Sequence, residues 1–469
     1  MTVFQTARRH AELGTDFFDP VAPADFPRLT LRHRDRRWAA RLGLDGLNEA
    51  EWLAHFGRFE PLPGSLPEPL ALRYHGHQFR SYNPDLGDGR GFLFGQCIDP
   101  VDGRLLDFGT KGSGKTPWSR GGDGRLTLKG GVREVLATEM LEALGVYTSK
   151  SFSLVETGEQ LHRGDEPSPT RSSVLTRLSH SHIRIGTFQR LAYLEDTANL
   201  ARLVDYAIAN YYPELADADD KAVAFLEAVT KNVARLGAQW IAAGFVHGVL
   251  NTDNINVTGE SFDYGPWRFL PAYDPDFTAA YFDETGLYAF GRQPDTLAWN
   301  LTRLAECLVP LSSIEALEPA LNAVWPGFRA ALPAAILRRL GLVPRDVETD
   351  GAFVTALFGF LGATRAPYEQ FFFDWRGGAL SAERAARSPS AEHYASEAFR
   401  PVADGLESYH PTAGVNLDHP YFARTTPRTM LIDEVEAIWA PIAANDDWSL
   451  FESTLSEIAE MRQAYGIVP

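Results

Sequence analysis

Residues 244–267 read GFVHGVLNTDNINVTGESFDYGPW and follow a long apolar helical pattern that ends near Ala243. The segment contains a polar loop with Asp253 and Asn254, then a short apolar strand, then Asp263 in the tripeptide Asp-Tyr-Gly. Amide and carboxylate oxygens are the hard ligands that Mg²⁺ prefers, and a free carboxylate can take the proton of a hydroxyl group. The segment therefore predicts a metal site at Asn254 and Asp263, with Asp253 as the proton acceptor.

The order of these features is that of a kinase catalytic loop followed by the metal-binding segment of the kinase fold. Against the pattern H-G-D-L-x-x-x-N, however, Val249 occupies the position of the usual catalytic aspartate. Asp253 is the only carboxylate inside the motif that could replace it. Each half of the segment could instead be a simple polar turn, but their occurrence together after a long helix favours the catalytic interpretation.

The regions on either side of this segment differ in pattern. Between residues 70 and 130, short apolar runs broken by glycine predict antiparallel strands, and residues 132–145 have helical spacing that ends at Gly145. Strands are expected again around 151–158 and 172–179. Helical patterns then dominate after residue 186, at 200–212, 221–244, 295–311, 314–325 and 432–443. This order predicts an α+β fold with two lobes, a sheet-rich N-terminal lobe with one key helix and a larger helical C-terminal lobe, with a ligand cleft between them.

Phosphate-binding candidates lie in the sheet-rich region. The turn LGDGRGF (86–92) contains Gly87 and Gly89, which allow backbone amides to approach an anion closely. Lys111 at the end of a predicted strand and Glu134 in the following helix have the arrangement by which kinase-like lobes present an ammonium group to phosphates. The alternative is a Walker A loop, because GTKGSGKT (109–116) matches that pattern through Lys115. That motif requires a helix directly after it, which the glycine-rich continuation PWSRGGDGR disfavours.

Two arginines, Arg177 and Arg184, lie seven residues apart with His180 and His182 between them. Because the planar guanidinium group suits phosphate oxygens, the arginines could clamp a phosphate. They could equally be surface residues that form ordinary ion pairs. A metal site at the two histidines is less favoured, because no cysteine or carboxylate cluster accompanies them.

The sequence resembles the selenoprotein O family, also called the YdiU family, of protein adenylyltransferases with a pseudokinase fold. The resemblance rests on the motifs YHGHQF-x-x-YNPDLGDGRG, KGSGKTPWSRGGDGR, VREVLATE, VLTRLSHSHIRIGTF, HGVLNTDN, DYGP and YAFGRQPDTLAWNLTRLAECL, in this order between about residues 70 and 310. The chain matches the family poorly after residue 310.

The resemblance implies a kinase-like fold that binds ATP in an inverted orientation and transfers AMP to Ser, Thr or Tyr hydroxyls of proteins, with release of pyrophosphate. It implies Asp253 as the base and Asn254 and Asp263 as ligands of Mg²⁺ or Mn²⁺. The nucleotide-binding positions that it implies are Gly87, Gly89, Arg90, Lys111, Asp123, Gly124, Glu134, Arg177, Arg184 and Asp263. Two other functions stay open, a phosphotransferase that uses the same cleft and, because of Val249, a catalytically inactive nucleotide-binding regulator.

The expected domain organisation follows from the resemblance and the patterns together. We expect an N-terminal extension packed on the kinase-like core (1–69), a nucleotide-binding N-lobe (70–185), a C-lobe with the catalytic and metal-binding loops (186–310) and a C-terminal helical extension (311–469).

The composition limits the class of partner. The 469 residues include 44 Lys and Arg against 61 Asp and Glu, a formal net charge of −17, which argues against a nucleic-acid or anionic-membrane surface. The charge is uneven, because residues 101–190 hold 13 basic and 10 acidic residues and residues 191–469 hold 19 and 38. A small anion such as ATP therefore remains a plausible ligand of the N-terminal part. Two cysteines and the lack of a long apolar run predict a cytoplasmic protein without a membrane span.

Overall fold

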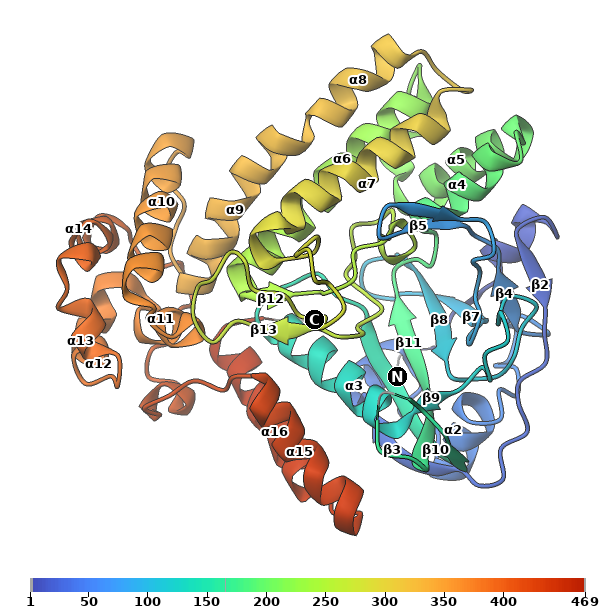
Figure 1. Cartoon of the computed structure of the whole chain (residues 1–469), viewed down its shortest axis with the longest axis horizontal. Coiled ribbons are helices and arrows are strands. Elements are labelled where there is room, and N and C mark those ends of the chain that lie inside the picture. Colours follow the sequence, from blue (N-terminus) through green and yellow to red (C-terminus); the bar gives the residue numbers. More distant parts are fainter. Residues whose placement is uncertain (1–2, 165, 468–469) are drawn as a thin grey trace.

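The computed structural model describes residues 3–164 and 166–467. It combines a large antiparallel sheet, built from the N-terminal part of the chain, with many helices that follow in sequence (Figure 1). The prediction of a sheet-rich part followed by a helical part is confirmed.

Within the described residues, nine strands form one antiparallel sheet in the order β2-β4-β7-β8-β11-β10-β3, with β1 beside β7 and β9 beside β11. These strands are β1 (Thr6–Ala7), β2 (Phe18–Pro20), β3 (Thr30–Arg34), β4 (Leu70–Leu72), β7 (Leu93–Ile98), β8 (Leu105–Lys111), β9 (Leu126–Thr127), β10 (Lys150–Leu161) and β11 (Thr170–Ser179). Strand β5 (Gly76–Gln78) pairs with β6 (Ser81–Asn83), and β12 (Phe245–Val246) pairs with β13 (Arg268–Phe269). The strands predicted between 70 and 130 and around 151–158 and 172–179 are thus present.

The register of β8 and β11 decides which side chains share a face. Lys111 is opposite Leu175, and Gly109 is opposite Arg177. Because side chains alternate between the two faces of a sheet, Lys111 and Arg177 lie on the same face at diagonal positions.

Helix α3 (Leu128–Ala143) covers this face of the sheet (Figure 1). It begins one turn before the predicted start, because the Thr127 side chain accepts a hydrogen bond from Gly130 N and caps the first turn. It ends as predicted near Gly145, whose φ of +81° is a left-handed conformation that favours glycine.

The remaining helices either pack against the sheet or form the helical part of the molecule. The α-helices are α1 (Arg36–Leu42), α2 (Glu49–Phe56), α4 (Ile185–Tyr193), α5 (Thr197–Tyr211), α6 (Lys221–Ala243), α7 (Gln293–Leu308), α8 (Ile314–Asn322), α9 (Val324–Leu340), α10 (Val347–Thr364), α11 (Tyr368–Asp374), α12 (Ala382–Ala386), α13 (Ala391–Tyr394), α14 (Arg400–Ser408), α15 (Ile432–Asn445) and α16 (Ser449–Ala464). The 3-10 helices are η1 (Arg9–Leu13), η2 (Pro213–Leu215), η3 (Thr252–Asn254), η4 (Phe290–Arg292), η5 (Gly378–Ser381), η6 (Glu397–Phe399) and η7 (Pro420–Ala423). All the helices predicted after residue 186 are present.

Helix α6 leads directly into the segment 244–267. Asp220 caps its first turn by accepting a hydrogen bond from Val223 N, and Gly244 ends it in a left-handed conformation with φ +63°. The chain then passes through β12, η3 and β13 with little regular structure between them. The segment 244–267 is therefore a set of loops held between α6 and the sheet.

Apolar clusters join the two parts. One continuous cluster includes residues of β8, β11, α3, α5, α6 and α16, so the sheet and the helical part share a core. The opposite face of the sheet packs against α1 and α2. A further core joins α9, α10, α11 and α14 to the end of α6 and to β12. No helix in the described part of the chain combines the length and apolar character that a bilayer span requires.

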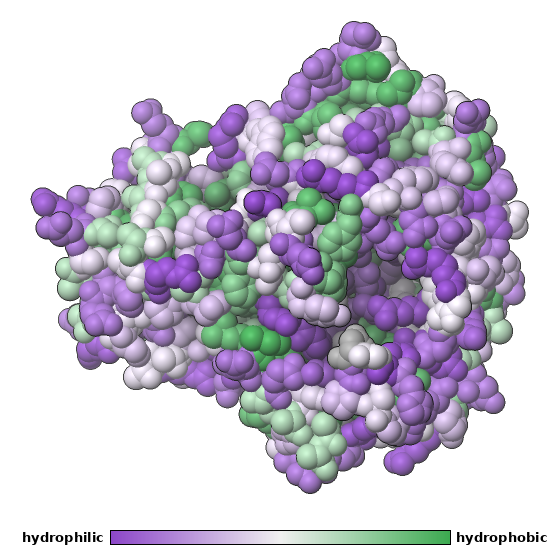
Figure 2. Space-filling view, in the orientation of Figure 1, coloured by the Kyte–Doolittle hydropathy of each residue, from purple (hydrophilic) through white to green (hydrophobic). Residues whose placement is uncertain are grey.

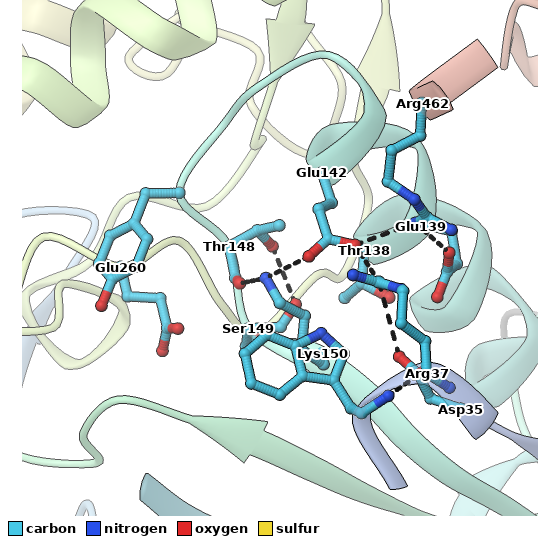
Figure 3. A network of polar contacts seen from close by, with 12 residues as sticks. Asp35, Arg37, Thr138, Glu139, Glu142, Thr148, Ser149, Lys150, Glu260 and Arg462 are labelled. Carbon is cyan, nitrogen blue, oxygen red and sulfur yellow. Dashed lines mark hydrogen bonds and ion pairs between the residues drawn. The ribbon is translucent and has the colours of Figure 1, made fainter. Parts of the chain in front are cut away.

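Both ends of the chain contact α3, the helix that carries Glu134. Arg462 of α16 pairs with Glu139 and with Glu142, each at 2.9 Å, and Arg37 of α1 pairs with Glu142 (Figure 3). The Lys150 ammonium group approaches the other oxygen of Glu142 to 3.1 Å. The last turns of α3 are thereby held from three sides, by α1, by β10 and by α16. The domain boundaries themselves stay a prediction, although residues 1–69 supply β1, β2 and β3 to the sheet.

Candidate functional site

A compact cluster of charges lies between the sheet and the 244–267 loops. Lys111 Nζ contacts Glu134 Oε1 of α3 and lies 2.8 Å from Asp263 Oδ1. Arg177 Nη2 lies 2.8 Å from Glu134 Oε1 and 2.5 Å from Asp263 Oδ1. Glu134 is fully buried, whereas the Asp263 side chain is 28% exposed. The predicted pairing of Lys111 with Glu134 is confirmed, and Arg177 joins it.

The cluster keeps both of its carboxylates ionised. Burial opposes ionisation of Asp263, but the Lys111 and Arg177 charges outweigh it and hold the pKa well below its usual range. The same balance of burial against Arg177 and Lys111 lowers the pKa of Glu134. Two cations and two carboxylates therefore face each other, with an exposed edge at Asp263.

The two predicted metal ligands lie side by side. Asn254 Nδ2 donates to Asp263 Oδ2 at 3.0 Å, so the amide oxygen of Asn254 remains available. Asp263 has φ +63°, a left-handed conformation that turns its side chain from the loop toward the cluster. One amide and one ionised carboxylate suit Mg²⁺, which commonly takes one or two protein ligands and completes its shell with phosphate oxygens and water. The residues present thus fit that ion.

Asp253 is half-buried beside this pair, in η3. Its Oδ1 atom is buried and has no hydrogen-bond partner among the described residues. Burial raises the pKa of Asp253 to about 6, although the nearby Arg184 charge opposes the shift. Arg184 Nη1 also donates to the Asp253 carbonyl oxygen at 3.3 Å. The arrangement leaves Asp253 with one free oxygen and a pKa close to neutral pH.

A cavity of about 650 Å³ brings together the two Gly-Asp-Gly-Arg segments and the base candidate. Its walls include the predicted positions Gly87, Gly89, Arg90, Asp123, Gly124 and Asp253. In the space-filling view the molecule is hollowed between the sheet-rich part and the helical part (Figure 2).

The glycines of the first segment are required by packing. A Cβ atom at Gly89 would lie 2.8 Å from the Trp118 carbonyl oxygen, and one at Gly87 would meet the Trp118 ring. The facing loop is tied to the turn, because Ser119 Oγ donates to Gly89 O at 2.6 Å. In the second segment, Asp123 is paired with Arg163 at 2.7 Å. Close packing against the loop of Trp118 and Ser119 therefore requires glycine at positions 87 and 89, whether or not these residues also bind phosphate.

The Walker A alternative is wrong. No helix follows Thr116, because the chain forms a loop up to β9 and α3 begins only at Leu128. Lys115 is exposed, whereas Lys111 is buried in the charge cluster. The surface alternative for Arg177 and Arg184 is also wrong, since both are 5% exposed. His180 and His182 are hydrogen-bonded to Tyr147 and Asp107, respectively.

Sequence reasoning missed several residues at the site. Arg184 lies 4.2 Å from the Tyr74 ring centroid and 5.2 Å from the Phe262 ring centroid. Asp88, inside the first glycine-rich turn, lies 3.6 Å from Arg184, and Trp118 forms part of the cavity wall. Asp88 and Trp118 lie in the motifs LGDGRGF and PWSRGGDGR, so the sequence could have indicated them. The contact of Arg184 with the Tyr74 ring could not be predicted from a local pattern, because the two residues are far apart in sequence.

Comparison with known proteins supports the same assignment over almost the whole chain. A family model described as "Protein adenylyltransferase SelO" matches residues 2–459. The expectation of a poor match after residue 310 is therefore wrong. The chain belongs to the SelO family of protein adenylyltransferases. The predicted family and enzyme class are thereby confirmed.

Several similar curated proteins carry the name "Protein nucleotidyltransferase YdiU". That of Gloeobacter violaceus is 45% identical over 470 residues, which cover 97% of this chain and 95% of the relative. That of a Synechocystis species is 45% identical over 468 residues, which cover 95% of this chain and 96% of the relative. That of a Bradyrhizobium species is 43% identical over 383 residues, 79% of this chain and 76% of the relative.

Proposed function

We propose that this member of the SelO family transfers AMP from ATP to Ser, Thr or Tyr hydroxyls of proteins and releases pyrophosphate. Membership of the family supports the reaction class. The observation that carries the assignment of residues is the Lys111–Glu134–Arg177–Asp263 cluster, which a 3.0 Å hydrogen bond from Asn254 to Asp263 links to the loop that places Asp253 on the cavity wall.

The proposal includes a kinase-like two-lobed fold, with the sheet and α3 as the smaller lobe. The triphosphate would lie along the two Gly-Asp-Gly-Arg segments and the cluster, in an inverted orientation that presents the α-phosphate to the acceptor hydroxyl. Arg90 on the exposed rim and the buried pair Arg177 and Arg184 supply positive charge along this path. The missing kinase aspartate at Val249 is compatible with this chemistry, because Asp253 supplies another carboxylate from the same loop to the cavity wall.

The proposed step is an in-line displacement. The hydroxyl oxygen of the protein substrate forms a bond to the α-phosphorus, and the bond from that phosphorus to the bridging oxygen breaks. Pyrophosphate leaves with the electron pair, and the hydroxyl proton goes to the Asp253 carboxylate. Arginine and lysine charges stabilise the oxygens that become more negative in the transition state.

Asn254 and Asp263 are the residues that would hold Mg²⁺, with Mn²⁺ as the other candidate. When bound, the ion would neutralise charge on the phosphate oxygens. The Lys111 and Arg177 charges contribute here by holding Asp263 ionised over the whole physiological pH range. We also infer a cytoplasmic location, since the substrate is ATP and Cys97 and Cys307 are free, buried thiols.

Labelled ATP tests the proposal against its two rivals. Wild-type protein is incubated with a cell extract and with ATP labelled at either the α- or the γ-phosphate. AMP transfer predicts protein-bound label from the α position alone. Label from the γ position alone would establish a phosphotransferase, and no label with intact ATP binding would support the inactive regulator that Val249 suggests. Asp253→Asn is the matched variant, since it keeps the shape of the side chain and removes the base.

A further inference from the structure

Three exposed aromatic side chains gather beside the 244–267 loops. Tyr281 is 86% exposed, Phe282 is 45% exposed and Phe79 is 41% exposed. Their rings form a contiguous row, with centroids 5.2 Å apart for Tyr281 and Phe282 and 5.9 Å apart for Phe79 and Phe282. We call these three residues the aromatic patch. Single exposed apolar side chains are normal, but a contiguous aromatic group marks a surface that binds a partner.

The loop that presents the patch is built to hold its shape. Asp283 is 5% exposed, and its two carboxylate oxygens accept hydrogen bonds from Leu287 N and Tyr288 N, each at 2.8 Å. Phe79 adopts φ +49°, a conformation that is costly for a bulky residue. A fixed loop and a strained residue keep the rings at the surface, so a partner would meet a preorganised site.

The patch is joined directly to the proposed catalytic loop. Asn251, two residues before Asp253, accepts hydrogen bonds on the same side-chain oxygen from Phe79 N at 3.1 Å and from the Tyr288 hydroxyl at 2.7 Å. The Tyr288 ring packs against Phe79 with centroids 5.0 Å apart. Gln78, the neighbour of Phe79, lines the cavity that contains Asp253. The Phe79 end of the patch therefore adjoins the cavity wall through Gln78 and the proposed catalytic loop through Asn251.

We propose that the aromatic patch docks the protein substrate by binding a bulky apolar side chain close to the acceptor hydroxyl. The proposal rests on the proposed function, because only a protein substrate has to reach Asp253 from outside while ATP occupies the cavity. A row of aromatic rings packed edge to face suits leucine, isoleucine, methionine or phenylalanine, which bury apolar area against it. The enzyme would thus prefer hydroxyls flanked by an apolar residue over hydroxyls in wholly polar segments.

A peptide scan tests this preference. The substrates are short polar peptides with one central Thr, Ser or Tyr, in which a single leucine is moved through the neighbouring positions. The wild-type protein should modify peptides with leucine at one or two positions with kcat/KM about tenfold higher than the leucine-free peptide, since burial of one such side chain is worth at least that factor. The double variant Tyr281→Ser/Phe282→Ser should lose the preference while its affinity for ATP stays unchanged. Leu380→Ser, which removes a 71% exposed side chain from η5, is the matched control and should keep the preference.

The outcomes separate the two proposals. A flat leucine scan for the wild-type protein, or a preference that survives in the double variant, overturns the docking surface and leaves AMP transfer intact. Absence of transfer to every peptide and to every protein of a cell extract overturns the proposed function, and the docking surface with it. Concentration-dependent dimerisation that the double variant abolishes would assign the patch to a second copy of this chain and would also overturn the proposal.

Discussion

The pH dependence of AMP transfer gives a direct test of Asp253 as the base. Burial raises the pKa of this carboxyl from 3.8 to about 6, and the Arg184 charge opposes part of the shift. A general base acts only in its ionised form, so the rate should rise with pH through the pKa and level off above it. The relevant window lies between pH 5 and pH 7.

The expected magnitude follows from the pKa. With a pKa of about 6, about 91% of Asp253 is ionised at pH 7 and about 9% at pH 5, so kcat/KM should fall about tenfold between them. A fully solvated aspartate with the ordinary value of 3.8 would remain more than about 90% ionised at pH 5, and the rate would hardly change. The size of the fall therefore reports burial of this group.

The assay is pyrophosphate release coupled to label transfer from α-labelled ATP, measured from pH 5 to pH 8 at constant ionic strength. Asp253→Asn should reduce kcat by ~10²- to 10⁴-fold and flatten the remaining profile, because the base is gone. Arg184→Gln removes a charge that lowers the Asp253 pKa, so the midpoint should move to higher pH even as phosphate binding weakens. A wild-type rate that does not change between pH 5 and pH 7, or an Asp253→Asn profile with the wild-type midpoint, would refute the assignment.

Three further predictions concern the cluster and its support. Lys111→Met should abolish transfer and lower the free energy of unfolding by ~3 kcal/mol, because it breaks a buried ion pair. Lys115→Met should leave both the transfer rate and the free energy of unfolding nearly unchanged. If the two variants lose equally in transfer assays and in urea unfolding, the assignment of Lys111 is wrong. Arg462→Met removes two ion pairs to α3, each at 2.9 Å. It should lower the free energy of unfolding by ~1–3 kcal/mol and speed amide hydrogen exchange in α3. Unchanged exchange would show that α16 does not stabilise α3. Gly89→Ala places a Cβ atom 2.8 Å from a backbone oxygen of the facing loop, so the KM for ATP should rise several-fold. Gly46→Ala is the control, because a Cβ atom there meets open space, and it should leave the KM for ATP unchanged.

Much of the local structure follows from the sequence. The apolar spacing in 132–145 predicted the body of α3, and Gly145 predicted its end. The start was missed by one turn, because the cap at Thr127 is a side-chain hydrogen bond that apolar periodicity does not record. The glycine-rich continuation after Thr116 correctly disfavoured the Walker A loop, since it cannot start a helix there.

The site was predicted as a set of residue types but not as an arrangement. The segment 244–267 predicts Asn254 and Asp263 as joint metal ligands, and the structure joins them by a 3.0 Å hydrogen bond. Arg177 had two open interpretations, and only its burial against Glu134 and Asp263 decided between a surface residue and a member of the cluster. The support of α3 by Arg462 could not be predicted, because the two contacting residues lie more than 300 positions apart.

The sequence alone determined the family, the order of strands and helices and the chemical groups available for phosphate, metal and proton. These properties depend on residue type and on short-range spacing, which motifs and periodicity record directly. Only the tertiary structure decided that Lys111, Glu134, Arg177 and Asp263 meet at one point, that burial raises the pKa of Asp253 to about 6 and that Phe79, Tyr281 and Phe282 form one aromatic patch. Burial and electrostatic coupling depend on packing between segments that are distant in sequence, and local patterns carry no signal of that packing.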